Sequence, residues 1–336
     1  MASILLKPKI KLFFTDFWPV FNIEDNYFLD VLSPEFDIEL DEKNPDFLIY
    51  SVFGTSFYRY NCIRIFYTGE NIRPDFTRCD YSFSFDFSDD PRSFRLPLYP
   101  FFGDPEKLLK QRNINDIMIS KTEFCNFIYS NPGPAERVDF FHKLSKYKKV
   151  ISAGRFLNNT GIPLKNKKDF LSKFKFTIAF ENQSWPGYTT EKIFEPMLVG
   201  SLPIYWGNPL ISKDFNPDSF LNYHDYGSVD ELIDRIIEID SNDDLWAKYL
   251  SQPYFHDNEL SEYVDPALIR ERFRMIFNTK KNPVAAEHPA ASHNRIVKTA
   301  ALASEDFKFN INKYRRKFSN FSIWRARIKL LKLIGR

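Results

Sequence analysis

The chain has 336 residues, more than one hydrophobic core usually organises, so we expect two domains and an appendage. Apolar residues make up 43 % and aromatic residues 17 % of the chain, a composition that excludes general disorder. The formal net charge of +2 is segregated: residues 307–336 hold ten Lys or Arg and no acid, and the preceding part carries a net charge of −8. An anionic partner is therefore expected for this tail and not for the whole protein.

The N-terminus and the cysteines indicate the cellular compartment. Residues 4–6 are the only apolar run before several lysines, far too short for a signal-peptide core or a membrane span. The three cysteines, Cys62, Cys79 and Cys125, match no C-x-x-C pattern. We therefore expect a cytoplasmic protein without a cysteine-based metal or redox site.

Short apolar runs of strand length recur in the first half of the chain, at residues 10–14, 47–50 and 63–67. Their spacing favours an α/β sheet over a β-sandwich. A loop rich in Pro, Asn and Gly follows at residues 130–134, and a basic helix-like stretch continues to Lys149. We place the domain boundary here and expect a first domain of residues 1–147.

Residues 148–282 alternate more regularly between strand and helix. We expect strands at residues 150–151, 176–180, 202–206 and 220–223, and helices at residues 166–174, 190–199 and 229–239. Such alternation is typical of a parallel sheet, whose ligand lies beyond the carboxyl ends of the strands.

Several common motifs are missing from the sequence. There is no G-x-G-x-x-G, no P-loop, no G-x-S-x-G and no H-E-x-x-H, which disfavours the usual dinucleotide oxidoreductases, P-loop enzymes, serine hydrolases and zinc proteases. No Asp-x-Asp pair occurs either. A phosphate ligand would therefore be neutralised by cationic side chains and a helix N-terminus instead of a metal held by that pair.

Residues 180–195 offer these groups, because they follow an expected strand and open an expected helix. A threonine can cap that helix, and Lys192 lies in its first turn, where the helix dipole disfavours a cation unless an anion is bound. Asn182 and Tyr188 supply further donors, and Glu191 can accept hydrogen bonds from sugar hydroxyls. The alternative is that residues 180–182 merely end a strand and that Lys192 is solvated.

Three strings in this region, at residues 180–182, 188–192 and 202–207, resemble the signature of the α-1,3/4-fucosyltransferases, glycosyltransferase family 10, bacterial type. Further similar strings occur in the family's order at residues 66–71, 80–81, 95–99, 127–131 and 152–155. The resemblance implies the GT-B architecture of two Rossmann-like domains facing a cleft. Residues 1–147 would bind the acceptor and residues 148–282 would bind GDP-fucose. Trp185 and Pro186 depart from the family pattern, in which smaller or more polar residues are expected.

The resemblance also implies the reaction. An inverting enzyme would move L-fucose from GDP-β-L-fucose to the 3-hydroxyl of N-acetylglucosamine in an N-acetyllactosamine-like glycan, with no obligatory metal or other cofactor. Glu70 follows Thr68-Gly69 at the end of an apolar strand, and it matches the family's catalytic glutamate. We expect Glu70 to be the general base that takes the proton of the acceptor hydroxyl.

The donor-binding residues are expected in the second domain. Arg155 lies in the loop after its first strand, where a guanidinium can make two hydrogen bonds to a phosphate, and Lys192 adds a second charge. Tyr188 and Asn182 would fix the geometry of the phosphate and the sugar. By resemblance, Glu191 would hold donor hydroxyls and steady the positive charge that develops on the sugar ring.

Three other functions stay open at this point. Another nucleotide-sugar transferase of envelope polysaccharide synthesis would keep the fold and change the sugar. A carbohydrate-binding protein with a degenerate site is disfavoured by the complete set of candidate residues. A glycosidase could use Glu70 and Glu191 as its pair of carboxylates.

Beyond a linker expected at residues 283–306, residues 307–336 are expected to form a basic amphipathic helix. Arg325, Lys329, Lys332 and Arg336 share one face of that helix, and Trp324 lies among apolar residues on the other side. Such a helix can lie on an anionic membrane surface, which would make the protein peripheral on the inner face of the cell membrane. Alternatively it packs on the acidic body. No nucleic-acid-binding module is recognised in the chain.

Overall fold

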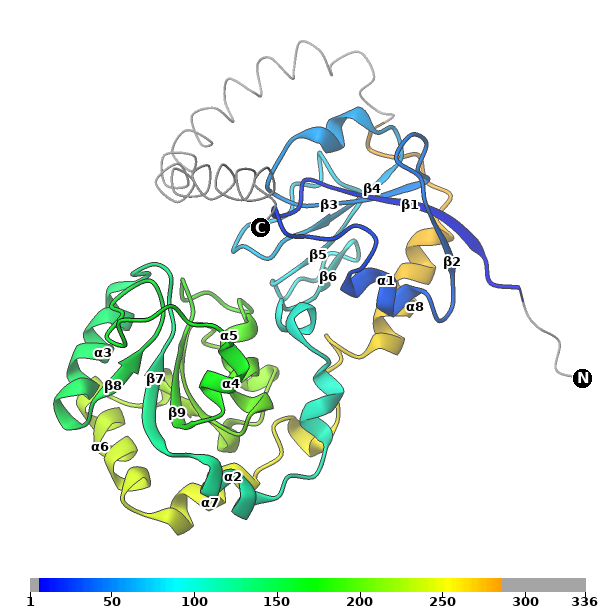
Figure 1. Ribbon diagram of the computed structural model, residues 1–336. Coiled ribbons are helices and arrows are strands. Elements are labelled where there is room, and N and C mark those ends of the chain that lie inside the picture. Colours follow the sequence, from blue (N-terminus) through cyan, green and yellow to red (C-terminus); the bar gives the residue numbers. More distant parts are fainter. Residues whose placement is uncertain (1–5, 286–336) are drawn as a thin grey trace, which may run out of the picture. The chain divides into compact units, whose positions relative to one another are not determined.

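The computed structural model describes residues 6–285, which form two parallel sheets with helices around them (Figure 1). The basic helix expected at residues 307–336 and all but the first residues of the expected linker lie outside these described residues. Between residues 6 and 285, no helix is both long and apolar enough to cross a membrane.

The first sheet has six strands in the order β2-β1-β3-β4-β5-β6, and every neighbouring pair is parallel. Its strands are β1 (Lys9–Thr15), β2 (Asp37–Leu40), β3 (Phe47–Tyr50), β4 (Ile63–Tyr67), β5 (Tyr81–Ser84) and β6 (Ser93–Arg95). All residues of β3 and β4 are buried, as expected for parallel strands that are covered on both faces. The strands predicted from apolar runs in the first half are confirmed as β1, β3 and β4.

Two helices far apart in the sequence cover one face of this sheet: α1 (Tyr27–Leu32) and α8 (Pro266–Phe277). Phe28 of α1 and Phe273 of α8 lie in one core with Ile49 and Ile65 of the sheet, and Figure 1 shows the two helices side by side. Asn26 caps α1 by accepting hydrogen bonds from two backbone N–H groups of its first turn. The chain therefore returns to its first sheet after completing the second.

The second sheet has five parallel strands in the order β11-β10-β9-β7-β8. They are β7 (Glu123–Phe127), β8 (Val150–Ser152), β9 (Phe174–Phe180), β10 (Leu202–Trp206) and β11 (Leu221–Asn222), and the helices around them are α2 (Ile114–Ser120), α3 (Ala135–Tyr147), α4 (Lys167–Leu171), α5 (Glu191–Leu198), α6 (Val229–Asp240) and α7 (Asp243–Ser251). The strands and helices predicted for residues 150–239 are present, but the helix expected at residues 166–174 ends at Leu171, Phe174 already belongs to β9, and the strand expected at residues 220–223 is only Leu221–Asn222. In the register of β9 and β10, Phe180 lies opposite Trp206, so both strands end at the same level.

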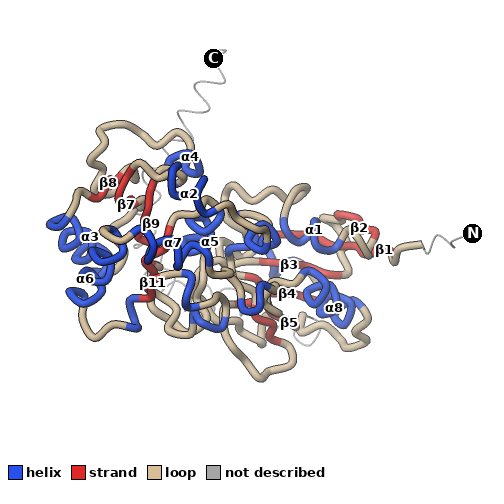
Figure 2. Tube along the Cα trace, turned by 90° about the horizontal axis from the view of Figure 1, so that it is seen from below, coloured by secondary structure: helices blue, strands red, loops and turns tan. Residues whose placement is uncertain are grey.

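Alternate side chains of β9 and β10 enter two different cores, as the two-residue period of a strand requires. Ile178 and Ile204 pack with the buried faces of α3, α6 and α7, whereas Ala179 and Tyr205 pack with α5. Figure 2 shows α3 and α6 together beside β7 and β8. The sheet is therefore covered on both faces, and its ligand must approach an edge where strands end.

The expected division between residues 147 and 148 does not match the membership of the sheets. β7 pairs with β8 and β9, and α3 packs on the second sheet, so the chain passes to this sheet between Arg95 and Glu123. The loop at residues 130–134 connects β7 to α3 and does not end a domain, because both elements belong to the second sheet and its core. The α/β fold with two Rossmann-like sheets is confirmed, but α8 belongs to the core of the first sheet.

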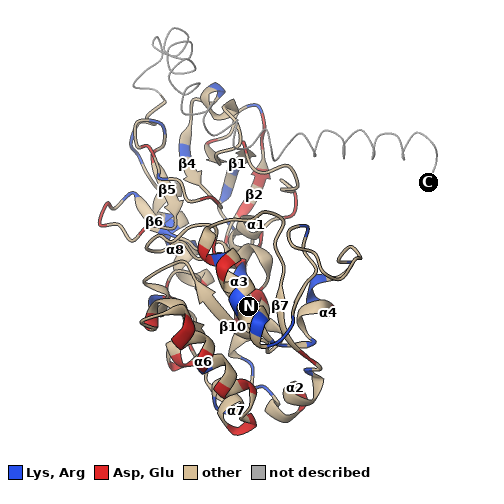
Figure 3. Ribbon diagram, turned by 90° about the vertical axis from the view of Figure 1, so that its left-hand side faces the viewer, with Lys and Arg blue, Asp and Glu red and all other residues tan. Residues whose placement is uncertain are grey.

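The acidic charge predicted for the body of the protein gathers on two helices. Figure 3 shows Asp and Glu along α6 and α7, which follow one another in the chain. Ser228 caps α6 by accepting a hydrogen bond from the backbone N–H of Glu231, and Leu232, Ile236 and Ile239 are buried at helical spacing. The acids thus occupy the solvent-facing side of an amphipathic helix.

Candidate active site

The candidate site is built on the loop of residues 181–190, which leaves the carboxyl end of β9 and leads into α5. The backbone N–H of Glu181 donates to the carbonyl of Trp206 at 2.7 Å, so the loop starts beside the end of β10. This is the edge at which open parallel sheets bind their ligands. The loop carries Asn182 and Tyr188, and the first turn of α5 carries Glu191 and Lys192, which together are four of the six predicted site residues.

Lys192 lies between two carboxylates. Its Nζ is 3.1 Å from Oε2 of Glu181 and 3.5 Å from Oε1 of Glu191. The Glu181 side chain is fully buried, and those of Lys192 and Glu191 are 15 % and 17 % exposed. The structure therefore excludes a freely solvated Lys192 and brings it together with Glu191, as predicted.

The pKa values of these three groups depend on one another. Burial lowers the pKa of Lys192, but the charges of Glu181 and Glu191 outweigh burial and raise it overall. Burial raises the pKa of Glu181 although Lys192 opposes the shift, and for Glu191 the lysines Lys192 and Lys167 outweigh burial and lower the pKa. The carboxylates thus favour the charged form of Lys192, and the lysines favour the ionised form of Glu191.

Thr190 occupies the N-cap position of α5, but its side chain makes no capping hydrogen bond, in contrast to our expectation. Its hydroxyl contacts both carboxylate oxygens of Glu181 and accepts a hydrogen bond from Lys192 Nζ at 2.9 Å. The threonine therefore anchors Glu181 and Lys192. The Thr190 side chain therefore does not occupy the backbone N–H groups in the first turn of α5, and these groups can bind an anion.

Tyr188 is buried next to the cluster and is influenced electrostatically by a residue of the first sheet. Burial raises its pKa, and the negative charges of Glu181, Glu70 and Glu191 raise it further, against Lys192. Glu70 comes from the loop after β4. The structure thus brings the candidate base into the electrostatic surroundings of the candidate donor site.

The loop that carries Glu70 also contacts the loop of residues 181–190 directly. The Thr68 hydroxyl accepts a hydrogen bond from the backbone N–H of Glu70 and donates one to its carbonyl, both at 2.9 Å. Nδ2 of Asn71 donates to Oε1 of Gln183 at 2.7 Å. The turn after β4 is therefore fixed by Thr68 and is held against the candidate donor loop.

Arg155 is the predicted site residue that the structure does not bring into the cluster. It lies in the bend after β8, its side chain is exposed, and it makes no hydrogen bond or ion pair with another described residue. The bend itself is fixed, because the backbone N–H of Phe156 donates to the carbonyl of Tyr129 at 2.9 Å. A Cβ on Gly154 would lie 2.2 Å from the same carbonyl oxygen. Arg155 follows a strand of the same parallel sheet, so it lies at the carboxyl edge with a guanidinium that has no partner among these residues.

Arg137 of α3 is a buried residue that the sequence analysis missed. Its Nη2 donates to the carbonyls of Phe180 and Glu181, at 2.8 and 2.7 Å, and to Oδ1 of Asn182 at 2.9 Å. The guanidinium also packs over the ring of Tyr129, 3.9 Å from its centroid. Arg137 therefore orients Asn182 and the start of the loop of residues 181–190. Helical spacing could have indicated that Arg137 is buried, because residue 137 lies on the same face of α3 as the buried Phe140, Phe141 and Leu144.

A second missed feature is a buried ion pair between Arg95 of β6 and Asp214. Two hydrogen bonds of 2.6 and 2.7 Å join the side chains, which are 3 % and 0 % exposed. Nη2 of Arg95 also donates to the carbonyl of Gly187, and the Thr189 hydroxyl donates to Asp214 at 2.6 Å. Arg95 and Thr189 lie within two of the strings considered above, at residues 95–99 and 188–192, but the sequence did not predict their contacts with Asp214.

Gly187 allows this loop to lie close to the first sheet. Its φ of +87° is in the left-handed region, and a Cβ would lie 2.0 Å from the carbonyl oxygen of Phe85. The backbone N–H of Gly187 donates to Oδ1 of Asn208 at 2.7 Å. Contacts from both sheets therefore determine where Tyr188 lies.

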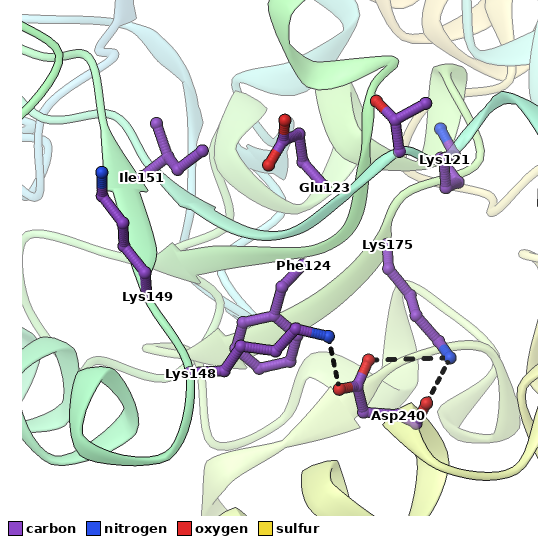
Figure 4. A pocket seen from close by; sticks show the side chains of 9 residues that line it. Lys121, Glu123, Phe124, Lys148, Lys149, Ile151, Lys175 and Asp240 are labelled. Carbon is purple, nitrogen blue, oxygen red and sulfur yellow. Dashed lines mark hydrogen bonds and ion pairs between the residues drawn. The ribbon is translucent and has the colours of Figure 1, made fainter.

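A hollow of about 270 Å³ lies at the opposite edge of the second sheet, where β7, β8 and β9 begin. Its lining includes Lys121, Lys148, Lys149 and Lys175 (Figure 4). Asp240 neutralises two of them, because its carboxylate lies 3.1 Å from Lys148 Nζ and 3.7 Å from Lys175 Nζ. None of the predicted site residues lines this hollow. Among residues 6–285, no group of three or more His, Cys, Asp or Glu is placed to hold a metal ion.

Comparison with known proteins gives two family matches. Residues 12–102 match the N-terminal domain of the alpha-(1,3)-fucosyltransferase FucT, and residues 118–260 match the C-terminal part of glycosyltransferase family 10 (fucosyltransferase). The alpha-(1,3)-fucosyltransferase FucT of Helicobacter pylori is 32 % identical over 273 residues, which are 68 % of this chain and 57 % of that protein. Alpha-(1,3)-fucosyltransferase B of Drosophila melanogaster is 32 % identical over 139 residues, 37 % of this chain and 31 % of that protein.

A similar fold is found in a solved structure. A crystal structure of an alpha1,3-fucosyltransferase with GDP-fucose superimposes with a TM-score of 0.72 at 28 % identity, covering 84 % of this chain and 94 % of that one. The GT-B architecture implied by the resemblance is thereby confirmed. The chain belongs to glycosyltransferase family 10, the family of the fucosyltransferases.

Proposed function

We propose that this protein transfers L-fucose from GDP-β-L-fucose to a hydroxyl of an oligosaccharide acceptor, with inversion at the anomeric carbon. The observation that carries the proposal is Lys192, which two carboxylates hold charged at the N-terminus of α5, beside the loop of Glu70. The names of the relatives and the GDP-fucose in the similar crystal structure support the choice of donor.

Inversion requires one displacement, in which the acceptor hydroxyl attacks the anomeric carbon while the bond from that carbon to the diphosphate breaks. Glu70 is assigned as the base that takes the hydroxyl proton, since its loop lies against the donor loop. Glu191, whose carboxylate stays ionised, holds sugar hydroxyls and faces the positive charge that develops on the ring.

The departing diphosphate is stabilised by three kinds of group. Lys192 supplies a fixed positive charge, and the first turn of α5 supplies backbone N–H groups at the positive end of its dipole. Arg155 supplies an exposed guanidinium at the same edge of the sheet. Asn182 and Tyr188 fix the geometry of the phosphate and the sugar. In this assignment the cations take the place of a divalent metal.

Initial-rate measurements with GDP-fucose and a panel of oligosaccharides test the function directly. We expect GDP release that depends on the acceptor, with the 3-hydroxyl of N-acetylglucosamine in N-acetyllactosamine as the preferred site. Competition with GDP-mannose distinguishes fucosyl transfer from another nucleotide-sugar transferase. Release of free sugar from oligosaccharides without any nucleotide would contradict the assignment in favour of a glycosidase.

The absence of an obligatory metal is tested by adding excess EDTA to the same assay. Transfer should persist, because Lys192, Arg155 and the helix N-terminus carry the neutralisation of the diphosphate. A modest stimulation by divalent cations is compatible with this assignment. Complete loss of activity that manganese restores would contradict it.

The basic segment of residues 307–336 is assigned to an anionic membrane surface, which would place the protein on the inner face of the cell membrane. The segregation of charge between this segment and the acidic helices α6 and α7 supports the assignment. Deletion of residues 307–336 should abolish sedimentation with vesicles that contain anionic lipid and leave turnover of small acceptors intact. An insoluble or inactive truncated protein would show that the segment is part of the fold.

A further inference from the structure

Trp185 is an exposed indole that its neighbours hold in place. The residue is 45 % exposed, although large apolar side chains are usually buried. Nε1 donates to Oδ1 of Asp86 at 3.1 Å, and the guanidinium of Arg73 packs over the ring, 4.5 Å from its centroid. Arg73 Nε is itself 2.9 Å from the same oxygen of Asp86. The ring is therefore fixed by a charged pair beneath it and presents the remainder of its surface to solvent.

The position of Trp185 relates it to both parts of the candidate site. Its carbonyl accepts a hydrogen bond from the backbone N–H of Tyr188 at 3.1 Å. Nη2 of Arg73 donates to Oδ1 of Asn71 at 2.7 Å, and Asn71 is the residue after Glu70. Trp185 therefore lies between the loop of the candidate base and the turn that leads to the donor residues.

Two chemical features of this surface fit a saccharide. A rigid aromatic ring offers an apolar face on which the C–H side of a pyranose can pack, and the ring loses little conformational entropy on binding because it is already fixed. Nη1 of Arg73 is buried and has no hydrogen-bond partner among the described residues. The second feature is therefore a partly buried cation that packs against one face of the ring, which leaves the other face for the sugar.

We propose that Trp185, with Arg73 and Asp86 behind it, is a subsite for a pyranose ring of the acceptor oligosaccharide. The inference rests on the proposed function, because it assigns the acceptor side of the same site. The sugar packs on the indole face that Arg73 leaves open, and its hydroxyl is thereby directed towards the loop of Glu70. Trp185 then determines which acceptors bind and leaves the donor chemistry unchanged.

The test measures two KM values and one rate on the full-length chain: the KM for the acceptor, the KM for GDP-fucose and the rate of fucose transfer to water. The acceptor is the most active saccharide of the panel. Trp185→Ala should raise the KM for this saccharide about tenfold, because an aromatic stacking contact is lost. The KM for GDP-fucose and the slow transfer of fucose to water without acceptor should both stay within about twofold of wild type. Trp185→Phe keeps a ring and should restore most of the acceptor affinity. Tyr147→Ala is the matched control, since it removes an exposed aromatic ring at the opposite edge of the second sheet.

The outcomes separate the inference from the function on which it rests. If wild type is active and Trp185→Ala leaves the acceptor KM unchanged, the subsite is wrong and the transferase activity stands. If Trp185→Ala also raises the KM for GDP-fucose or slows transfer to water, Trp185 only supports the donor loop and the subsite is again wrong. A wild-type protein that neither transfers nor hydrolyses GDP-fucose would overturn the proposed function and the subsite together.

Discussion

The two edges of the second sheet both place lysines beside carboxylates, but the amino edge has more lysines. At the carboxyl edge, one lysine, Lys192, lies between Glu181 and Glu191. At the amino edge, Asp240 is shared by Lys148 and Lys175, Asp243 lies 3.6 Å from Lys175, and two further lysines line the same hollow. The amino edge thus holds more positive charge, yet the predicted site residues gather at the other edge.

The pKa values of the lysines show what the difference means. Burial lowers the pKa of Lys121 to about 8, and burial also lowers that of Lys175 although Asp240 opposes the shift. Lys192 is buried too, but the charges of its two carboxylates raise its pKa. Carboxylates raise the pKa of a buried lysine only where their charges outweigh the cost of burial, as at Lys192 and not at Lys175, where Asp240 and Asp243 oppose the shift.

The largest effect is expected from Asp214→Ala, because the carboxyl edge depends on the buried pair that fixes the donor loop. Arg95 would be left buried and unpaired, so the free energy of unfolding should fall by about 3–5 kcal/mol. Denaturant unfolding measures this change. Asp90→Ala removes the partner of Arg92 in an exposed pair and should have a much smaller effect. Similar losses in the two variants would show that burial of the Arg95 pair does not matter.

Glu70→Gln should have the next largest effect, on catalysis instead of stability. Glutamine keeps the size and the hydrogen-bonding capacity of the side chain but cannot accept a proton at neutral pH, so kcat should fall about a hundredfold or more. The affinity for GDP should stay near wild type, since the phosphate groups are assigned to the second sheet. A variant with near-normal kcat would mean that Glu70 is not the base, and Glu191 would have to be reconsidered.

A further effect is expected at the amino edge and depends on pH. The pKa of Lys121 is about 8 in the folded protein against an ordinary value of 10.5, so the unfolded chain binds the extra proton between these pH values. The wild type should therefore gain stability relative to Lys121→Met as the pH rises from 8 to 10.5. Paired unfolding curves at several pH values measure the difference. A difference that does not change with pH would show that Lys121 titrates normally.

Sequence patterns predicted the elements of the fold well where the pattern was long or strongly apolar. The runs that became β3, β4 and β10 and the amphipathic helix α6 are cases of this kind. The pattern failed for β7, because Glu123 and Asn126 interrupt its five residues, so they form no apolar run. Because β7 was not predicted, the loop at residues 130–134 after it resembled a boundary between domains.

The sequence suggested which residues belong to the candidate site, but it did not predict the buried residues that hold them in place. Lys192 and Glu191 are neighbours in the sequence, so their proximity could be expected. The partner of Arg95 is 119 residues further along the chain, and a buried arginine cannot be told from a surface arginine by residue type. The fully buried Glu181 lies within the string of residues 180–182. Its residue type alone does not predict that it is the carboxylate nearest to Lys192.

The most direct test of the central claim is calorimetric titration of GDP into wild type, Lys192→Ala and Lys148→Ala. These variants remove one lysine from each edge of the same sheet, and both lysines are paired with carboxylates. Lys192→Ala should weaken GDP binding about tenfold or more, because a charge-assisted hydrogen bond to the diphosphate is lost. Lys148→Ala should bind GDP as wild type does. Unchanged binding by Lys192→Ala, or weakened binding by Lys148→Ala, would contradict the placement of the diphosphate at the carboxyl edge.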